Sequence, residues 1–114
     1  MRRSRVGIMA VIAIAAYRPR AGKERELLAA VRDHMPVLRS EHLITDRAPY
    51  VMRAEDGTIV EIFEWNSDDA IEQAHSNPEV QKLWARFNDA CEYIPLVSLA
   101  ECKEMFANFE PLNL

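Results

Sequence analysis

An almost unbroken apolar run near the start of the chain constrains its fold more than any other feature. Residues 6–17 read VGIMAVIAIAAY, are rich in valine and isoleucine, and carry no helical stripe. Such a run is typical of a strand that is covered on both faces. The preceding MRRSR gives the segment the look of a signal peptide, but the apolar stretch is too short to span a bilayer. We therefore expect it to be retained as a buried first strand.

The rest of the chain alternates between helical and strand patterns. Apolar residues recur at helical spacing within 23–39, and a second helical segment that starts near residue 67 restarts at Pro78. Strand patterns occupy 42–54, 58–65 and 93–100. This β-α-β-β-α-β order predicts an α+β, ferredoxin-like βαββαβ domain, in which an antiparallel four-stranded sheet carries both helices on one face. We expect a single domain over residues 1–104, followed by a tail over 105–114.

The bare face of such a sheet needs a cover. The first strand, and much of the strand at 58–65, are apolar on both sides. Two copies packed sheet to sheet would bury this face, which predicts a homodimer in the form of a dimeric α+β barrel. The tail carries Met105, Phe106, Phe109 and Leu112, too many apolar side chains for a free tail. We expect it to pack on the domain or on the dimer partner.

Composition narrows the possible partners. The chain has 114 residues, a net charge of −4 and a pI near 5.4, which argues against nucleic acid and against anionic membrane surfaces. Cys91 and Cys102 form no CxxC pair, so we expect a reduced, cytoplasmic protein without a metal site. The sequence has no glycine-rich phosphate loop and no GxSxG motif. The motifs that usually identify kinases, dinucleotide enzymes and hydrolases are therefore absent.

The segment VEIFEWNSDDAIEQAH, residues 60–75, carries the candidate functional residues. Glu61, Phe63 and Trp65 share one face of the strand. Because an unpaired buried carboxylate costs several kcal/mol, Glu61 must find a partner, reach water or hold a proton. His75, near a helix end, is either a polar cap or an acid or base at a pocket mouth.

The aromatic and charged neighbours have simpler readings. Trp65 and Trp84 are either core residues or walls of a cavity for a flat ligand. We expect His34 and His42 to be solvated, because both lie beside charged residues at element ends. The pair at 68–69 marks a helix start, where carboxylates suit the helix dipole.

The hairpin before residue 58 decides what surrounds Glu61, because a slip of one residue exchanges the two faces of a strand. A two-residue turn at 56–57 places Met52 opposite Glu61 and leaves its face, which then includes Tyr50, without a cation. Glu61 is then the best candidate acid or base, with His75 as its helper. A three-residue loop at 55–57 places Val51 opposite Glu61 and Arg53 within reach of it, as a structural ion pair. We favour the three-residue loop, because it gives the carboxylate a partner.

Residues 11–99 resemble the antibiotic biosynthesis monooxygenase-like superfamily of dimeric α+β barrels. The order of elements, the segment VEIFEWNSDDAIEQAHSNPEV and the aromatic stripe LWARF carry the resemblance. A strand that ends in an aromatic residue and leads into a helix of the form "EA…H" is typical of that superfamily, and Trp65, Ala74 and His75 stand in those places in this chain. The resemblance implies the fold and the dimer. Its members include cofactor-free oxygenases of aromatic substrates, haem degraders and proteins of unknown function.

The haem-degrading branch of that superfamily does not fit this chain. Its members use an asparagine in the first strand, a tryptophan in the second helix and a histidine beyond it. In this chain the first strand offers only aliphatic residues, and His75 stands where the tryptophan belongs. We therefore expect neither haem nor another cofactor.

Three functional hypotheses follow. The first is a cofactor-free monooxygenase-like enzyme that acts on a small aromatic or polyketide-like molecule, and the second is a non-catalytic binding or accessory dimer. The third is a barrel that assembles with another protein through its apolar tail. On the first hypothesis the catalytic residues are His75 and Glu61, and the substrate-binding residues are Trp65, Phe63, Tyr50 and Trp84.

Overall fold

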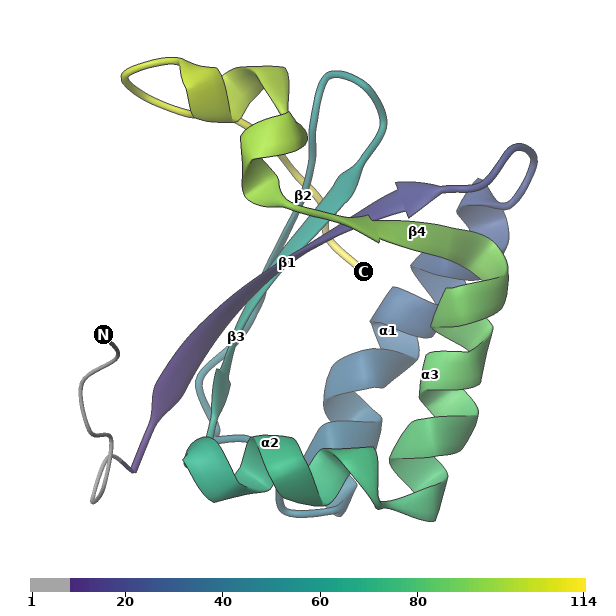
Figure 1. Cartoon of the computed structure of the whole chain (residues 1–114), viewed down its shortest axis with the longest axis vertical. Helices are drawn as coiled ribbons and strands as arrows, with labels where there is room; N and C mark the ends of the chain where they lie inside the picture. The colour runs from purple at the N-terminus through teal and green to yellow at the C-terminus, as the bar shows by residue number, and fades with distance from the viewer. Residues whose placement is uncertain (1–8) are drawn as a thin grey trace.

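A five-stranded antiparallel sheet organises the protein, and it carries its helices on one face (Figure 1). The computed structural model describes residues 9–114. The strands are β1 (Val11–Pro19), β2 (Tyr50–Arg53), β3 (Ile59–Trp65), β4 (Cys91–Ile94) and β5 (Glu110–Pro111), in the order β4-β1-β3-β2-β5. The helices are α1 (Glu24–Ser40), α2 (Asp68–His75) and α3 (Pro78–Ala90), with 3-10 turns at Leu96–Ser98 and Ala100–Lys103. The predicted ferredoxin-like α+β class is confirmed, with one strand more than expected.

Strand β1 lies inside the sheet, between β3 and β4. The apolar run predicts it over 6–17. The observed strand begins at Val11 and continues to Pro19, and residues 6–8 of the expected strand lie outside the described part of the chain. Ala13, Ala15 and Tyr17 face the helices, while Ile12 and Ile14 face the other way and are about half exposed. Because the two alanines are small, the space above them is not filled by β1 itself.

Helices α2 and α3 begin at residues that cap them. The Ser67 hydroxyl accepts a hydrogen bond from the Ala70 N–H at 3.2 Å, and the Asn77 side chain accepts one from the Val80 N–H at 3.1 Å. Side-chain acceptors at these positions satisfy N–H groups that the first helical turn leaves unpaired. Helices α1 and α3 lie side by side over the sheet, and α2 crosses near their lower end (Figure 1).

The hairpin between β2 and β3 has the expected three-residue loop. Val51 lies opposite Glu61, and the Ala54 N–H donates to the Thr58 carbonyl at 2.8 Å. Gly57 has a φ of +92°, a left-handed conformation that suits glycine. This register confirms the favoured alternative and excludes Met52 from the position opposite Glu61.

Two expected strands are shorter than their sequence patterns. The segment 42–54 forms a strand only at Tyr50–Arg53, with a separate bridge between Ile44 and Trp65. The segment 93–100 forms a strand only as far as Ile94, because Pro95 lacks the N–H that would extend the ladder and two 3-10 turns follow it. The fifth strand comes from the tail, where Glu110–Pro111 pairs with β2.

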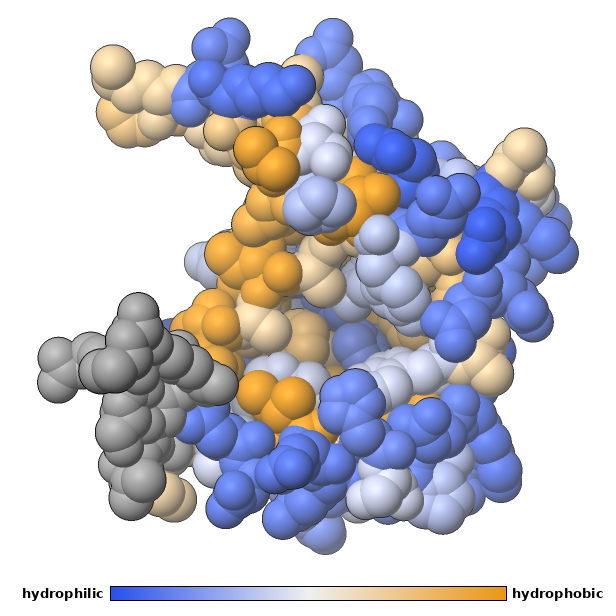
Figure 2. Space-filling model, viewed as in Figure 1, coloured by the Kyte–Doolittle hydropathy of each residue, from blue (hydrophilic) through white to orange (hydrophobic). Residues whose placement is uncertain are grey.

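The face of the sheet opposite the helices is only partly covered. Leu99, from the turns after β4, is fully buried and packs with Ala16 and Val60. Farther along this face Ile12 and Ile14 are 51% and 50% exposed. Figure 2 shows apolar side chains gathered beside a notch below the projecting C-terminal turns. Within residues 9–114, no helix is both long enough and apolar enough to cross a membrane.

Candidate active site

A cavity of about 380 Å³ lies between the sheet and the helices. It opens on the side of the molecule seen in Figure 2, between β1, β4, α2 and α3. The small side chains of Ala13 and Ala15 form its floor, which explains why the sheet and the helices leave a space there. Its lining residues are Ala13, Ala15, Tyr17, His34, Phe63, Trp65, His75, Gln81, Trp84, Phe87, Asn88 and Tyr93. The deep part is aromatic, and the exposed residues His75, Gln81, Asn88 and Tyr93 form the mouth.

Glu61 lies buried behind this wall, with none of its surface exposed. Its Oε1 accepts a hydrogen bond from the Tyr17 hydroxyl at 2.7 Å and lies 2.7 Å from His34 Nδ1. No other described group bonds to its second oxygen, Oε2. The expected ion pair with Arg53 is wrong, because Arg53 pairs instead with Glu24 and Glu110 near the surface. Glu61 therefore has polar partners but no cation from a lysine or arginine.

The hydrogen bonds around His34 define its tautomer. The Trp84 indole N–H lies 3.3 Å from His34 Nε2, and an indole nitrogen donates but never accepts. Nε2 therefore accepts, so the proton of the neutral ring is on Nδ1, from which it is donated to Glu61. A continuous chain of hydrogen bonds thus runs from Trp84 through His34 to Glu61, and Tyr17 donates to the same carboxylate. It joins α3, α1, β3 and β1.

Burial and the neighbouring carboxylate act together on Tyr17. Burial raises the pKa of its hydroxyl well above the usual range, and the negative charge of Glu61 raises that pKa further. Tyr17 therefore remains a neutral donor to Glu61 at all physiological pH values. Its ring is fixed by Phe87, with the two ring centres 4.9 Å apart.

The structure brings most of the predicted site residues together. Phe63, Trp65, Trp84 and His75 line the cavity, and Glu61 lies directly behind it. His75 packs edge-on against Trp84, with ring centres 5.2 Å apart. Tyr50 does not join them. It lies opposite Ile62 on the other face of the sheet and is 73% exposed, as the three-residue loop requires.

Sequence reasoning misses two residues of the buried chain of hydrogen bonds. His34 is expected to be solvated, but it is 3% exposed, so that prediction is wrong. The helical period does indicate its position, because it lies three residues after Val31 and four before Leu38, on the buried stripe. Tyr17 is predicted only as the last residue of the first strand, without a role in the site. The alternation of β1 puts it on the same face as Ala13 and Ala15. His42 is exposed, as expected.

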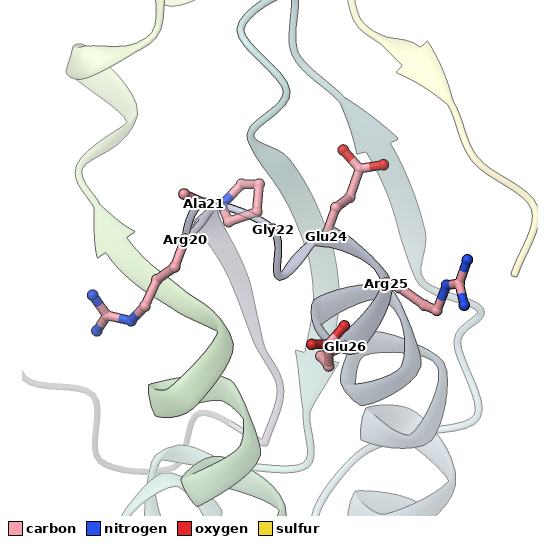
Figure 3. Close-up of a pocket in the computed structure, with 7 residues that line it drawn as sticks. Arg20, Ala21, Gly22, Glu24, Arg25 and Glu26 are labelled. Atoms are coloured by element: carbon pink, nitrogen blue, oxygen red, sulfur yellow. The ribbon is translucent and has the colours of Figure 1, made fainter.

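A larger hollow, of about 630 Å³, lies at the turn between β1 and α1. It is a shallow surface feature, and its charged side chains diverge rather than converge on one point (Figure 3). Arg20 extends to one side and Arg25 to the other, with Glu24 pointing away from both. This hollow lacks the buried polar groups of the aromatic cavity. Within residues 9–114, no group of three His, Cys, Asp or Glu side chains is arranged to hold a metal ion.

Comparison with known proteins identifies the fold. No protein-family model matches the chain, and no curated protein matches its sequence. SnoaB, a cofactor-independent oxygenase from Streptomyces nogalater, is 14% identical and matches with a TM-score of 0.64 over 75% of this chain and 86% of SnoaB. Rv0793 from Mycobacterium tuberculosis is 19% identical, with a TM-score of 0.61 over 75% of this chain and 88% of its own. Protein SO0527 from Shewanella oneidensis is 17% identical, with a TM-score of 0.60 over 75% and 85%. The chain has the fold of the antibiotic biosynthesis monooxygenase-like proteins.

Proposed function

We propose that this chain, which has the fold of the antibiotic biosynthesis monooxygenase-like proteins, is a cofactor-independent oxygenase of a small, flat organic molecule. The observation that carries the proposal is the aromatic cavity with a buried histidine–carboxylate pair in its wall. Buried titratable groups beside an apolar cavity are a common mark of an active site. The similarity of fold to SnoaB is consistent with this reaction class. The substrate class is an aromatic or polyketide-like ring system.

His75 is the residue that we assign to proton transfer with the substrate. It lies at the exposed mouth of the cavity, on the last turn of α2, and touches the Trp84 ring. A neutral imidazole there is able to take a proton from a weakly acidic C–H or O–H of a bound ring. The resulting carbanion or enolate is the form of an organic molecule that reacts with dioxygen. Phe63, Trp65 and Trp84 would hold the ring flat.

Oxygen uptake tests this function. Anthrone is a suitable probe, because it is a flat ketone whose enolate reacts with dioxygen to give anthraquinone and water. We expect the protein to accelerate oxygen uptake in the presence of anthrone, with equimolar formation of anthraquinone, and we expect His75→Gln to abolish most of that acceleration. His42→Asn is the matched control, because His42 is exposed, lies outside the cavity and has a φ of 60°, which asparagine tolerates. An equal loss in both variants would contradict the role of His75.

A binding protein without catalysis is the alternative. One observation favours it: both ring nitrogens of His34 are already engaged, so the most buried imidazole of the cavity has no free atom for a substrate proton. A binding protein needs only the cavity. The absence of oxygen uptake with anthrone and related ketones, together with tight binding of such rings, would support it.

We also propose that the protein is a cytoplasmic homodimer packed through the open face of its sheet. Ile12, Ile14 and Tyr50 are exposed there, and Phe106 on the projecting tail is 75% exposed. Contiguous exposed apolar groups of this kind are typical of an interface. Sedimentation at micromolar concentration should give about twice the 13.1 kDa mass of the chain. A stable monomer would overturn this proposal.

A further inference from the structure

We propose that Glu61 and Tyr17 determine the specificity of the cavity: together they favour a neutral ring that carries a hydroxyl group and disfavour an anionic ring. This inference rests on the proposed binding of a flat molecule in the cavity, but it does not depend on catalysis. Glu61 is a positioning residue, because it lies behind Tyr17 and His34 and does not itself line the cavity.

The first feature is the charge of the cavity wall. Among the described residues that line the cavity there is no lysine and no arginine. Arg53, which the hairpin register predicts as the ion-pair partner of Glu61, pairs instead with Glu24 and Glu110. The carboxylate of Glu61 is therefore a buried negative charge without a positive counterpart from these side chains. Because water does not reach it, its charge is screened less than that of an exposed carboxylate.

The second feature is His34, which among the described residues in contact with Glu61 is the one able to become a cation. Protonation of His34 would place a hydrogen on Nε2, where the Trp84 indole already donates. Two donors would then face each other at 3.3 Å, which opposes the charged form of the ring. A proton on Nε2 would therefore cost the hydrogen bond from Trp84.

The third feature is the hydroxyl of Tyr17. Its proton is directed to Glu61 Oε1, and no described group donates to its oxygen. A hydroxyl oxygen has two lone pairs, so this atom remains an acceptor for a ligand in the cavity. Burial and the charge of Glu61 raise the pKa of the Tyr17 hydroxyl, so it keeps its proton and continues to donate that proton to Glu61. The deep wall therefore offers an acceptor backed by a negative charge, which suits a ligand O–H and repels an anion.

The fourth feature is the polar mouth of the cavity, which would orient a bound ligand. Asn88 and Gln81 lie on exposed positions of α3 at the mouth, and the amide of Gln81 is held there by the hydrogen bond that its nitrogen donates to the Ala74 carbonyl at 3.2 Å. A ligand with one hydroxyl and one carbonyl would therefore enter with the hydroxyl toward Tyr17 and leave the carbonyl near the mouth. This arrangement separates the two polar ends of the ligand by the aromatic wall.

Three probes with the same ring system test the inference: 2-naphthol, 2-methoxynaphthalene and 2-naphthoate at neutral pH. Binding is followed by NMR through the indole N–H signals of Trp65 and Trp84, which are the only two tryptophans of the chain and both line the cavity. We expect 2-naphthol to bind more tightly than 2-methoxynaphthalene, and 2-naphthoate to bind at least about tenfold more weakly than 2-methoxynaphthalene.

Two variants separate the contributions. Tyr17→Phe should remove the preference for 2-naphthol over 2-methoxynaphthalene and leave the discrimination against 2-naphthoate in place. Glu61→Gln, which keeps the shape and removes the charge, should raise the affinity for 2-naphthoate by about tenfold. Glu64→Gln is the matched control, because it removes the same charge from the same strand on the opposite face, where Glu64 pairs with Arg47. It should leave all three affinities unchanged.

The outcomes distinguish this inference from the proposed enzyme. Selective binding without oxygen uptake would support the inference and contradict the oxygenase. Oxygen uptake with equal affinity for 2-naphthoate and 2-methoxynaphthalene would contradict the inference alone. Failure of all three probes to shift either indole signal would overturn both. If Glu61→Gln does not fold, the wild-type order of the three probes and Tyr17→Phe still decide the matter.

Discussion

His34 on α1 and Glu61 on β3 form a buried polar pair, with His34 Nδ1 and Glu61 Oε1 2.7 Å apart and the two side chains 4% and 0% exposed. The pair ties the longest helix to an inner strand of the sheet. Since Tyr17 and Trp84 extend it on either side, it also fixes two walls of the cavity. The contribution of the His34–Glu61 pair to stability, and the position of the imidazole proton, can therefore be measured directly.

We predict that His34→Leu destabilises the protein by about 3–5 kcal/mol, because it leaves the Glu61 carboxylate buried with only Tyr17 as a partner. Replacement of His34→Leu, Glu61→Met and Tyr17→Phe together should recover most of that loss, since no carboxylate is then left buried and only the part-buried Trp84 indole N–H loses its acceptor. Urea unfolding at a fixed protein concentration measures both. A triple variant less stable than His34→Leu would show that the pair is net stabilising.

We predict that the neutral ring of His34 carries its proton on Nδ1. Nitrogen-15 chemical shifts of the imidazole rings report this directly, and the chain has only three histidines to assign. In Trp84→Phe the donor to Nε2 is lost, so the preference for a proton on Nδ1 should weaken and the Nε2 shift should change. Leu83→Met, one residue away in the core, serves as the control and should leave the ring shifts as in the wild type. A proton on Nε2 in the wild type would disprove the order of hydrogen bonds from Trp84 through His34 to Glu61.

We predict that stability falls as the pH rises above about 9. Burial raises the pKa of the Cys91 thiol to about 11, and burial together with Glu61 raises the pKa of Tyr17 well above its usual range. The folded protein then holds protons that the unfolded chain has lost, so each group lowers stability by up to about 1.4 kcal/mol per pH unit once its unfolded form ionises.

Denaturant unfolding across an alkaline pH series measures this slope. Tyr17→Phe should make the slope shallower above about pH 10, where an unfolded tyrosine ionises. Tyr50→Phe, at an exposed tyrosine outside the cavity, is the control and should not change it. A wild-type stability that stays level into strongly alkaline solution would contradict the prediction.

We predict that Gly57→Ala lowers stability by about 1–2 kcal/mol, because an alanine must adopt the left-handed conformation that Gly57 holds at φ +92°. A Cβ at this position meets no atom within 4 Å, so the cost comes from the backbone conformation alone. Glu55→Ala in the same loop is the control, since Glu55 hydrogen-bonds to Glu101 through its backbone N–H, which alanine retains. Equal unfolding temperatures for Gly57→Ala and Glu55→Ala would show that the loop accommodates alanine at position 57 without a cost in stability.

Local signals in the sequence predict the parts of the fold that local chemistry controls. The caps at Ser67 and Asn77 and the loop that ends at Gly57 depend on residues within three positions of each other, so their effects can be read from a short segment. The register of β2 against β3 follows from that loop. The alternation of side chains along β3 then places Phe63 and Trp65 on the face that lines the cavity.

The partners of Glu61 are not predictable in this way. Reach along the hairpin points to Arg53, but His34 and Tyr17 approach from elements far away in the sequence. The packing of α1 over the sheet brings His34 to the carboxylate, and the pairing of β1 with β3 brings Tyr17. The charged neighbours of His34 wrongly suggest a solvated side chain, whereas its place in the helical stripe indicates burial.

The short strand β5 has a consequence for how copies of the chain meet. It pairs with the outer side of β2, and the Leu112 N–H donates to the Val51 carbonyl at 2.8 Å just beyond it. The backbone groups of β2 that would otherwise invite a foreign strand are thus occupied by the chain's own end. The edge of the sheet on that side is therefore the two-residue strand β5, which is too short to template a foreign strand well, and removal of residues 110–112 would expose the longer edge of β2 to aggregation.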